Sequence, residues 1–181
     1  MERKFLFLDC DGVMATMNSY NKMRSDGNCD FDPRAVEALN IVIEKVPELE
    51  IVISSTWRWG ETIESFQTIL DVRGVVNAKV VGLTPRIKLI KTSGNLISAP
   101  RGCEIQEWLN DFYVTDRPYH PDMTMKEEYE WRKANPYYYL ILDDDSDMLY
   151  YHRKNFIKTN GKTGFKEVNK AIRILNTPVI N

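Results

Sequence analysis

Cysteine and histidine are both scarce in this chain, which limits the kinds of site that it can build. Its three cysteines, Cys10, Cys29 and Cys103, are an odd number at spacings that match neither a zinc site nor a disulfide framework. Neither of the two histidines, His120 and His152, has a partner at metal-ligand spacing. The sequence therefore predicts reduced thiols and no zinc centre.

Long apolar runs and an excess of one charge are also absent. The first apolar run, 5–8, stops at Asp9 and is too short for a signal sequence or a membrane span, and no later run does better. We therefore expect a cytoplasmic protein without a membrane partner. Because 24 Lys and Arg balance 26 Asp and Glu, no global field would hold the chain on a polyanion, and any such binding must be local.

Internal repeats and low-complexity linkers are likewise missing from the sequence. The apolar fraction of 43% and the charged fraction of 28% are ordinary globular values, which exclude collagen-like and disordered classes. A length of 181 residues is enough to bury a sizeable core but short for two domains. We therefore predict a single domain over residues 1–181.

What the sequence does contain is an alternation of short apolar strands and amphipathic helices. Strands are predicted at 5–8, 49–53, 78–83, 138–142 and 155–158. Helices are predicted from Pro33 to 46, with Asp32 as cap, at 63–70, from just after 100–102 to 112, and at 168–175, whereas 84–100 is unassigned. This order predicts an α/β, Rossmann-like three-layer sandwich, in which a mainly parallel sheet carries helices on both faces.

Three of the predicted strands end in polar side chains. The groups that follow them are Asp9-Cys10-Asp11, Ser54-Ser55 and Asp143-Asp144. In such sheets ligands bind beyond the carboxyl ends of the strands, so these groups are expected to meet at one rim. Carboxylates gathered there would repel one another unless a cation neutralised them. Oxygen ligands with few histidines favour Mg²⁺ over zinc.

Three segments, in order, resemble motifs of the haloacid dehalogenase (HAD) superfamily. Phe7-Leu8-Asp9-Cys10-Asp11-Gly12-Val13 resembles its first motif, Ile51-Val52-Ile53-Ser54-Ser55 its second and Leu140-Ile141-Leu142-Asp143-Asp144 its fourth. The third motif is a single Lys or Arg near the start of a helix. We place it at Arg101, with Lys88 and Lys91 as alternatives.

A closer resemblance is to a compact branch of that superfamily, which includes phosphatase domains associated with nucleic-acid end repair. It is carried by Ser55-Thr56-Trp57-Arg58, Arg101-Gly102-Cys103-Glu104-Ile105 and Asp143-Asp144-Asp145-Ser146-Asp147, and it extends from about Phe5 to Leu175. The resemblance implies one HAD-like phosphatase domain. Insertions at about 14–31 and 113–137 would serve as a small flap and loop in place of a large cap.

The resemblance also implies roles for individual residues. Asp9 would be the nucleophile that forms an aspartyl-phosphate, and Asp11 the general acid and base. Ser55 and Arg101 would hold the phosphoryl oxygens. The implied Mg²⁺ ligands are Asp9, Asp11 (through its carbonyl), Asp143 and Asp144, and the implied substrate-binding residues are Ser54, Thr56, Trp57 and Arg58.

The expected function is that of a Mg²⁺-dependent phosphomonoesterase acting on a nucleotide or on a terminal phosphate of a polynucleotide. Its partner would be a phosphorylated small molecule or a nucleic-acid end, and no protein partner is predicted. Two alternatives stay open: a non-catalytic regulator that binds Mg²⁺ and phosphate, and a nucleic-acid-binding domain that has lost the reaction. The order of the motifs favours a phosphatase over a receiver-like regulator. Here the spaced acids, Asp9 and Asp11, come first in the chain and the adjacent pair, Asp143 and Asp144, comes last.

Several side chains have a simpler structural interpretation. Cys10 is expected to point into the core, and Asp145 and Asp147 to cap a turn. Trp57 and Trp59 either line the substrate pocket or anchor the next helix. The tyrosines of 113–139 alternate with Lys and Arg and are able to stack on nucleobases. We favour the interpretation that they pack within the fold.

Overall fold

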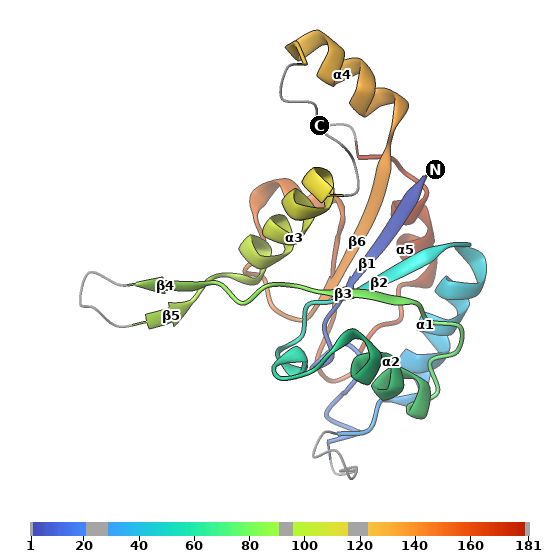
Figure 1. Cartoon of the computed structure of the whole chain (residues 1–181). Helices are drawn as coiled ribbons and strands as arrows, with labels where there is room; N and C mark the ends of the chain where they lie inside the picture. The colour runs from blue at the N-terminus through green and yellow to red at the C-terminus, as the bar shows by residue number, and fades with distance from the viewer. Residues whose placement is uncertain (1, 21–28, 91–95, 116–122, 180–181) are drawn as a thin grey trace.

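A five-stranded, wholly parallel sheet forms the centre of the protein (Figure 1). The computed structural model describes residues 2–20, 29–90, 96–115 and 123–179. The strands lie in the order β3-β2-β1-β6-β7. Their bounds are β1 Arg3–Leu8, β2 Leu49–Ile53, β3 Val80–Leu83, β6 Tyr137–Asp143 and β7 Phe156–Lys158. The predicted α/β class and parallel sheet are thus confirmed.

Strand β1 lies at the centre of the sheet and brings the polar strand ends to one level. Leu8 is in register with Ile53 of β2 on one side and with Leu142 of β6 on the other. The chain stays in step just beyond the strands, because the Asp9 amide donates to the Leu142 carbonyl over 3.1 Å. Parallel pairing in this register therefore places the residues after the three strands side by side.

Helices cover both faces of the sheet, as the alternation of its side chains requires. On one face, α1 (Pro33–Lys45), α2 (Ile63–Val72) and α5 (Val168–Leu175) pack over Leu6 and Leu8. On the other face lies α3 (Arg101–Thr115) (Figure 1). This helix packs over Phe5 and Phe7. Both phenylalanine rings meet Trp108 edge to face, at 5.1 and 5.4 Å between centroids.

The predicted start of α1 is confirmed. Asp32 is its N-cap, and its Oδ1 accepts from the Arg34 amide at 3.0 Å, with Pro33 in the first turn. Hydrogen bonds from Arg34, the largest of several causes, lower the pKa of Asp32 to about 2. A carboxylate that satisfies a free helix amide fixes where α1 begins.

A hairpin and a helix of the structure had no counterpart among the predicted strands and helices. The unassigned segment 84–100 contains the antiparallel hairpin of β4 (Lys88–Ile90) and β5 (Leu96–Ser98), which projects from the body of the fold (Figure 1). Helix α4 (Met125–Ala134) lies in the insertion 113–137. Three-residue strands give too short a pattern to detect, and α4 has little apolar periodicity because most of its residues are polar.

The helices that the structure describes include none that is long and apolar enough to span a membrane. The insertion predicted at 14–31 begins with buried residues, Met14 and Ala15, whereas 21–28 lie outside the described residues. Tyr119 and His120 also lie outside them. Tyr137, Tyr138 and Tyr139 are buried in β6, so for these three the packing interpretation is confirmed.

Candidate active site

Three carboxylates meet at the rim where β1 and β6 end. One oxygen each from Asp9, Asp143 and Asp144 lies within 4.8 Å of the others. Asp9 and Asp143 are only 6% and 2% exposed, whereas Asp144 is partly exposed. The structure therefore brings together three of the four acids predicted to hold a metal.

Burial makes this cluster electrostatically unfavourable when its members are all ionised. The pKa of Asp9 is raised to about 6, first by burial and also by the charge of Asp11, although Arg101 and a hydrogen bond from Ser55 lower it. The pKa of Asp143 is raised to about 7 by burial and then by the charge of Asp9. The pKa of Asp144 is raised as well, chiefly by burial. At neutral pH these acids share protons unless a cation compensates them.

The donor set fits a hard divalent cation. Asp143 Oδ1 accepts from the Asp145 amide at 2.8 Å, but Asp143 Oδ2 is buried without a hydrogen-bond partner in the described part of the chain. The guanidinium Nε of Arg101 lies 3.6 Å from that oxygen, which is too long for a hydrogen bond. An unsatisfied buried carboxylate oxygen beside two further carboxylates is the arrangement expected of an oxygen-ligand metal site.

Gly12 allows Asp144 to come close to the loop after β1. It adopts a φ of +68°, and a Cβ at this position would lie 2.0 Å from Asp144 Oδ2. Its carbonyl accepts a hydrogen bond of 2.9 Å from the hydroxyl of Thr159, the residue after β7. The loops after β1, β6 and β7 are therefore packed against one another without room for a side chain at Gly12.

The carboxylate of Asp11 lies outside the three-acid cluster and is held by a tryptophan. Trp57 Nε1 donates to Asp11 Oδ2 at 2.9 Å. The indole is itself packed, with its centroid 5.9 Å from that of Phe31 and 5.5 Å from the guanidinium carbon of Arg73. The bond involves only the carboxylate of Asp11. It does not engage the Asp11 carbonyl, which the sequence prediction assigned to the metal. Among the alternatives open for Trp57, the structure favours the lining of the site.

Ser55 lies at the same rim, at the start of the short 3₁₀ helix η1 (Thr56–Arg58). Its Oγ accepts from the Trp57 amide at 3.3 Å and it also interacts with Asp9. Ser54 is fully buried, and its hydroxyl lacks a hydrogen-bond partner among the described residues. Thr56, in contrast, is exposed. Ser55 is therefore beside Asp9, and substrate contacts of Ser54 and Thr56 stay predictions.

Arg101 is the base placed beside the acids. It begins α3, and its charge lowers the pKa of both Asp9 and Asp143. Lys88, an alternative for the third motif, is exposed on the projecting hairpin, and Lys91 lies outside the described residues. Geometry therefore favours Arg101 over Lys88.

Arg58 differs from its predicted role in substrate binding. Its guanidinium is buried and donates to the carbonyls of Ser54, Ser55, Thr84 and Pro85 and to Glu104 Oε2, the last at 2.7 Å. A guanidinium has five N–H groups, and these five acceptors use them all. Arg58 thus ties the second-motif loop to the segment after β3 and to α3, which leaves no donor for a phosphate.

Two other aspartates also serve the fold. Asp147 Oδ2 accepts from the Arg101 amide at 2.7 Å, so Asp147 caps α3 instead of the turn that follows it in sequence. Asp145 Oδ1 accepts from the next amide, that of Ser146. Neither belongs to the three-acid cluster. Cys10 is fully buried in the core, as predicted, and burial raises the pKa of its thiol well above the usual value.

Two residues at the rim had no signal in the sequence. The pKa of Tyr20 is raised, first by burial and then by the charges of Asp11 and Asp144, so this phenol lies within electrostatic range of the acids. Lys158, at the end of β7, donates to Ser146 Oγ, and its charge lowers the pKa of Asp144. Both come from loops whose approach to the site depends on the tertiary fold.

Comparison with known proteins gives one family. The model of the HAD domain in Swiss Army Knife RNA repair proteins matches residues 5–169. Two solved structures of the HAD domain of the effector protein Lem4 from Legionella pneumophila are similar, one of an inactive mutant. They align with TM-scores of 0.44 and 0.43 at 14% identity, over 96% and 94% of this chain and 92% of each of theirs. No curated protein matches.

The pairing of Arg58 with Glu104 predicts a large effect on stability. Glu104→Ala leaves the buried Arg58 without its counter-ion and should lower the free energy of unfolding by about 3–5 kcal/mol. Urea denaturation measures the change. The matched control is Glu107→Ala on the exposed side of α3, which should change stability by less than about 0.5 kcal/mol. Equal effects of the two variants would contradict the structural role of Arg58.

Proposed function

This chain belongs to the family of HAD domains in Swiss Army Knife RNA repair proteins, and on that premise we propose that it is a Mg²⁺-dependent phosphomonoesterase. The substrate would be a terminal phosphate of a polynucleotide or a nucleotide. The observation that carries the proposal is the meeting of Asp9 with Asp143 and Asp144 within 4.8 Å, beside Arg101. Such a site suits phosphoryl transfer, in which positioning and charge compensation supply most of the catalysis.

In the first step a carboxylate oxygen of Asp9 attacks the phosphorus and the P–O bond to the leaving alkoxide breaks. Asp11, held by Trp57, protonates that alkoxide. In the second step the ionised Asp11 takes a proton from water, the water oxygen attacks the phosphorus, and the bond to Asp9 breaks to release inorganic phosphate.

The remaining residues hold charge and position. Ser55 donates to a phosphoryl oxygen, and Arg101 compensates negative charge on the equatorial oxygens. Asp9, Asp143 and Asp144, with the Asp11 carbonyl, would hold Mg²⁺. When bound, this ion supplies positive charge to the phosphoryl group and to the carboxylates.

The nucleophile is tested by replacing the oxygen that attacks. Asp9→Asn should lower phosphate release from an aryl phosphate by at least about 10³-fold, as loss of a covalent nucleophile does in other enzymes. Steady-state assays with and without Mg²⁺ measure this, and Asp71→Asn on the exposed face of α2 is the control. Full turnover by Asp9→Asn would overturn the proposal, and a long-lived acyl phosphate without turnover in the unaltered protein would favour the regulator.

The metal site is tested by stability. In the folded protein without metal, the pKa values of Asp9 and Asp143 are near 6 and 7. Between about pH 4 and 7 the folded protein therefore binds more protons than the unfolded chain. The contribution of the cluster to stability accordingly falls as pH rises. Mg²⁺ needs the ionised acids. A Mg²⁺ concentration of 100 times the Kd at pH 7.5 should raise Tm by about 5–10 °C at that pH. The same concentration should raise Tm by less than half as much at pH 5.5.

Differential scanning calorimetry in EDTA or Mg²⁺ measures these shifts. Comparing each pair at one pH removes the separate contribution of His152, whose pKa burial lowers to about 4. Asp143→Asn should abolish the Mg²⁺ effect, and Asp71→Asn should keep it. A Mg²⁺ shift that is equal at both pH values would contradict the assignment of ligands.

The role of Trp57 is tested by the choice of leaving group. Trp57→Phe removes the N–H that holds Asp11, so kcat/KM for an alkyl phosphate, whose alkoxide needs a proton, should fall about tenfold. The same parameter for p-nitrophenyl phosphate should fall much less, because its leaving group is stable without a proton. Trp59→Phe, at an exposed position, is the control. Equal losses on both esters would mean that Trp57 serves only packing.

A further inference from the structure

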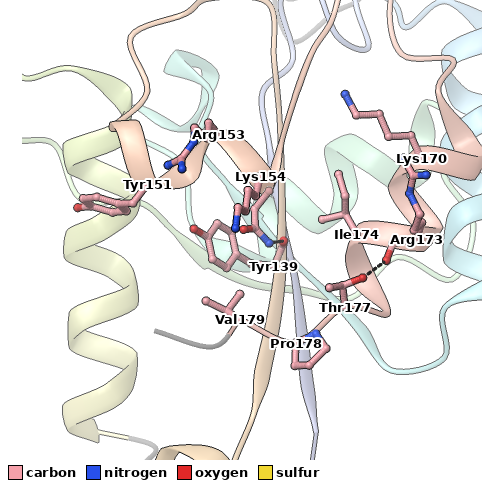
Figure 2. A pocket seen from close by; sticks show the side chains of 11 residues that line it. Tyr139, Tyr151, Arg153, Lys154, Lys170, Arg173, Ile174, Thr177, Pro178 and Val179 are labelled. Carbon is pink, nitrogen blue, oxygen red and sulfur yellow. Dashed lines mark hydrogen bonds between the residues drawn. The ribbon is translucent and has the colours of Figure 1, made fainter.

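A basic cavity lies toward the opposite end of β6 from the acids. Its volume is about 580 Å³, and it lies between the 3₁₀ helix η2 (Tyr150–Lys154) and α5 (Figure 2). Tyr139 of β6 lines it, whereas Asp143 ends the same strand four residues later. At about 3.3 Å per residue, roughly 13 Å of strand separates the cavity from the catalytic rim.

The cavity exists because the edge strand is short. β7 pairs with β6 only from Ile141 to Asp143. The earlier part of β6 is instead bonded by the side chain of Asn155, which donates to the Tyr139 carbonyl, and by the Val179 amide, which donates to the Tyr137 carbonyl. Backbone hydrogen bonds are thus satisfied while the space beside the strand stays open.

Four bases line the cavity from two walls. Arg153 and Lys154 come from η2, and Lys170 and Arg173 come from α5 (Figure 2). The eleven lining residues include no acid, and none of these bases forms an ion pair within the described part of the chain. Four cations brought together without counter-ions form a local positive field in a chain whose net charge is −2.

The bases continue from the cavity to the acids. Lys154 lies just before β7 and Lys158 ends it, beside Asp144. Lys162 is exposed in the next loop, whose Gly161 lies against Asp144, with a Cβ there 3.4 Å from Asp144 Oδ2. Within 150–175 the sequence has seven Lys and Arg against the single acid Glu167. One edge of the fold therefore carries a line of positive charge that ends at the catalytic rim.

We propose that this cavity binds the sugar-phosphate backbone of a single-stranded RNA, a few nucleotides from the terminal phosphate at Asp9. The inference rests on the proposed function and extends it to the part of the substrate that does not react. The phosphates lie between the wall with Lys154 and the wall with Lys170. The exposed ring of Tyr151 is available for a nucleobase of the RNA to stack on. Remote contacts of this kind select a polymer over a mononucleotide.

Direct binding tests the cavity. Fluorescence anisotropy with a labelled eight-nucleotide RNA that carries a terminal phosphate, in EDTA so that this phosphate is not released, compares the unaltered protein with Lys154→Ala/Lys170→Ala. The double variant should bind about tenfold more weakly, and its slope of log K against log salt should be shallower by about 1.4, the value for two lost phosphate contacts on a single strand. The control Lys45→Ala/Lys126→Ala removes two exposed lysines of α1 and α4 and should change neither value.

Activity assays separate this inference from the proposed function. The double variant should keep kcat/KM for an aryl phosphate and lose about tenfold in kcat/KM for the phosphorylated RNA. Loss of RNA binding in a protein without phosphatase activity would support the cavity and overturn the proposed function. RNA binding equal to that of the unaltered protein, with or without a fall in Tm, would overturn the cavity.

Discussion

Repulsion among buried carboxylates is the constraint on which this rim depends. Three parallel strands end at one level, so the residues that follow β1 and β6 are brought together by backbone pairing whatever their charge. Burial then raises the pKa of Asp9 and Asp143. Ionisation of such a cluster lowers the stability of the folded state, and a destabilising cluster of this kind is typical of a functional site.

The surrounding structure is arranged to hold that cluster and its neighbours in place. Arg58 joins three segments through carbonyl groups and Glu104, and Asp147 joins the end of β6 to the start of α3. Trp57 connects the loop after β2 to Asp11 after β1. Each link crosses between strand-end loops, so the rim behaves as one packed unit whose side chains are oriented before a substrate arrives.

The sequence predicted well what depends on local pattern. Apolar runs located the strands, Asp32 and Pro33 located the start of α1, and strand ends followed by Asp9 and Asp143 located the rim. The long-range partners could not be predicted. The five acceptors around Arg58 and the bond from Trp57 to Asp11 depend on which loops face each other, and the hairpin and α4 lack a periodic apolar pattern. Prediction of the basic cavity likewise requires knowledge of how short β7 is.

The place of β1 at the middle of the sheet has a consequence for biosynthesis. This strand is made before both of its neighbours, and its second neighbour β6 is more than 130 residues further along the chain. Until the ribosome has delivered β6, the apolar strand β1 has one unpaired side in the nascent chain. Closing so long a loop is slow, so we expect refolding to be sluggish, to depend on chain concentration through aggregation, and to benefit from chaperones that shield unpaired strands.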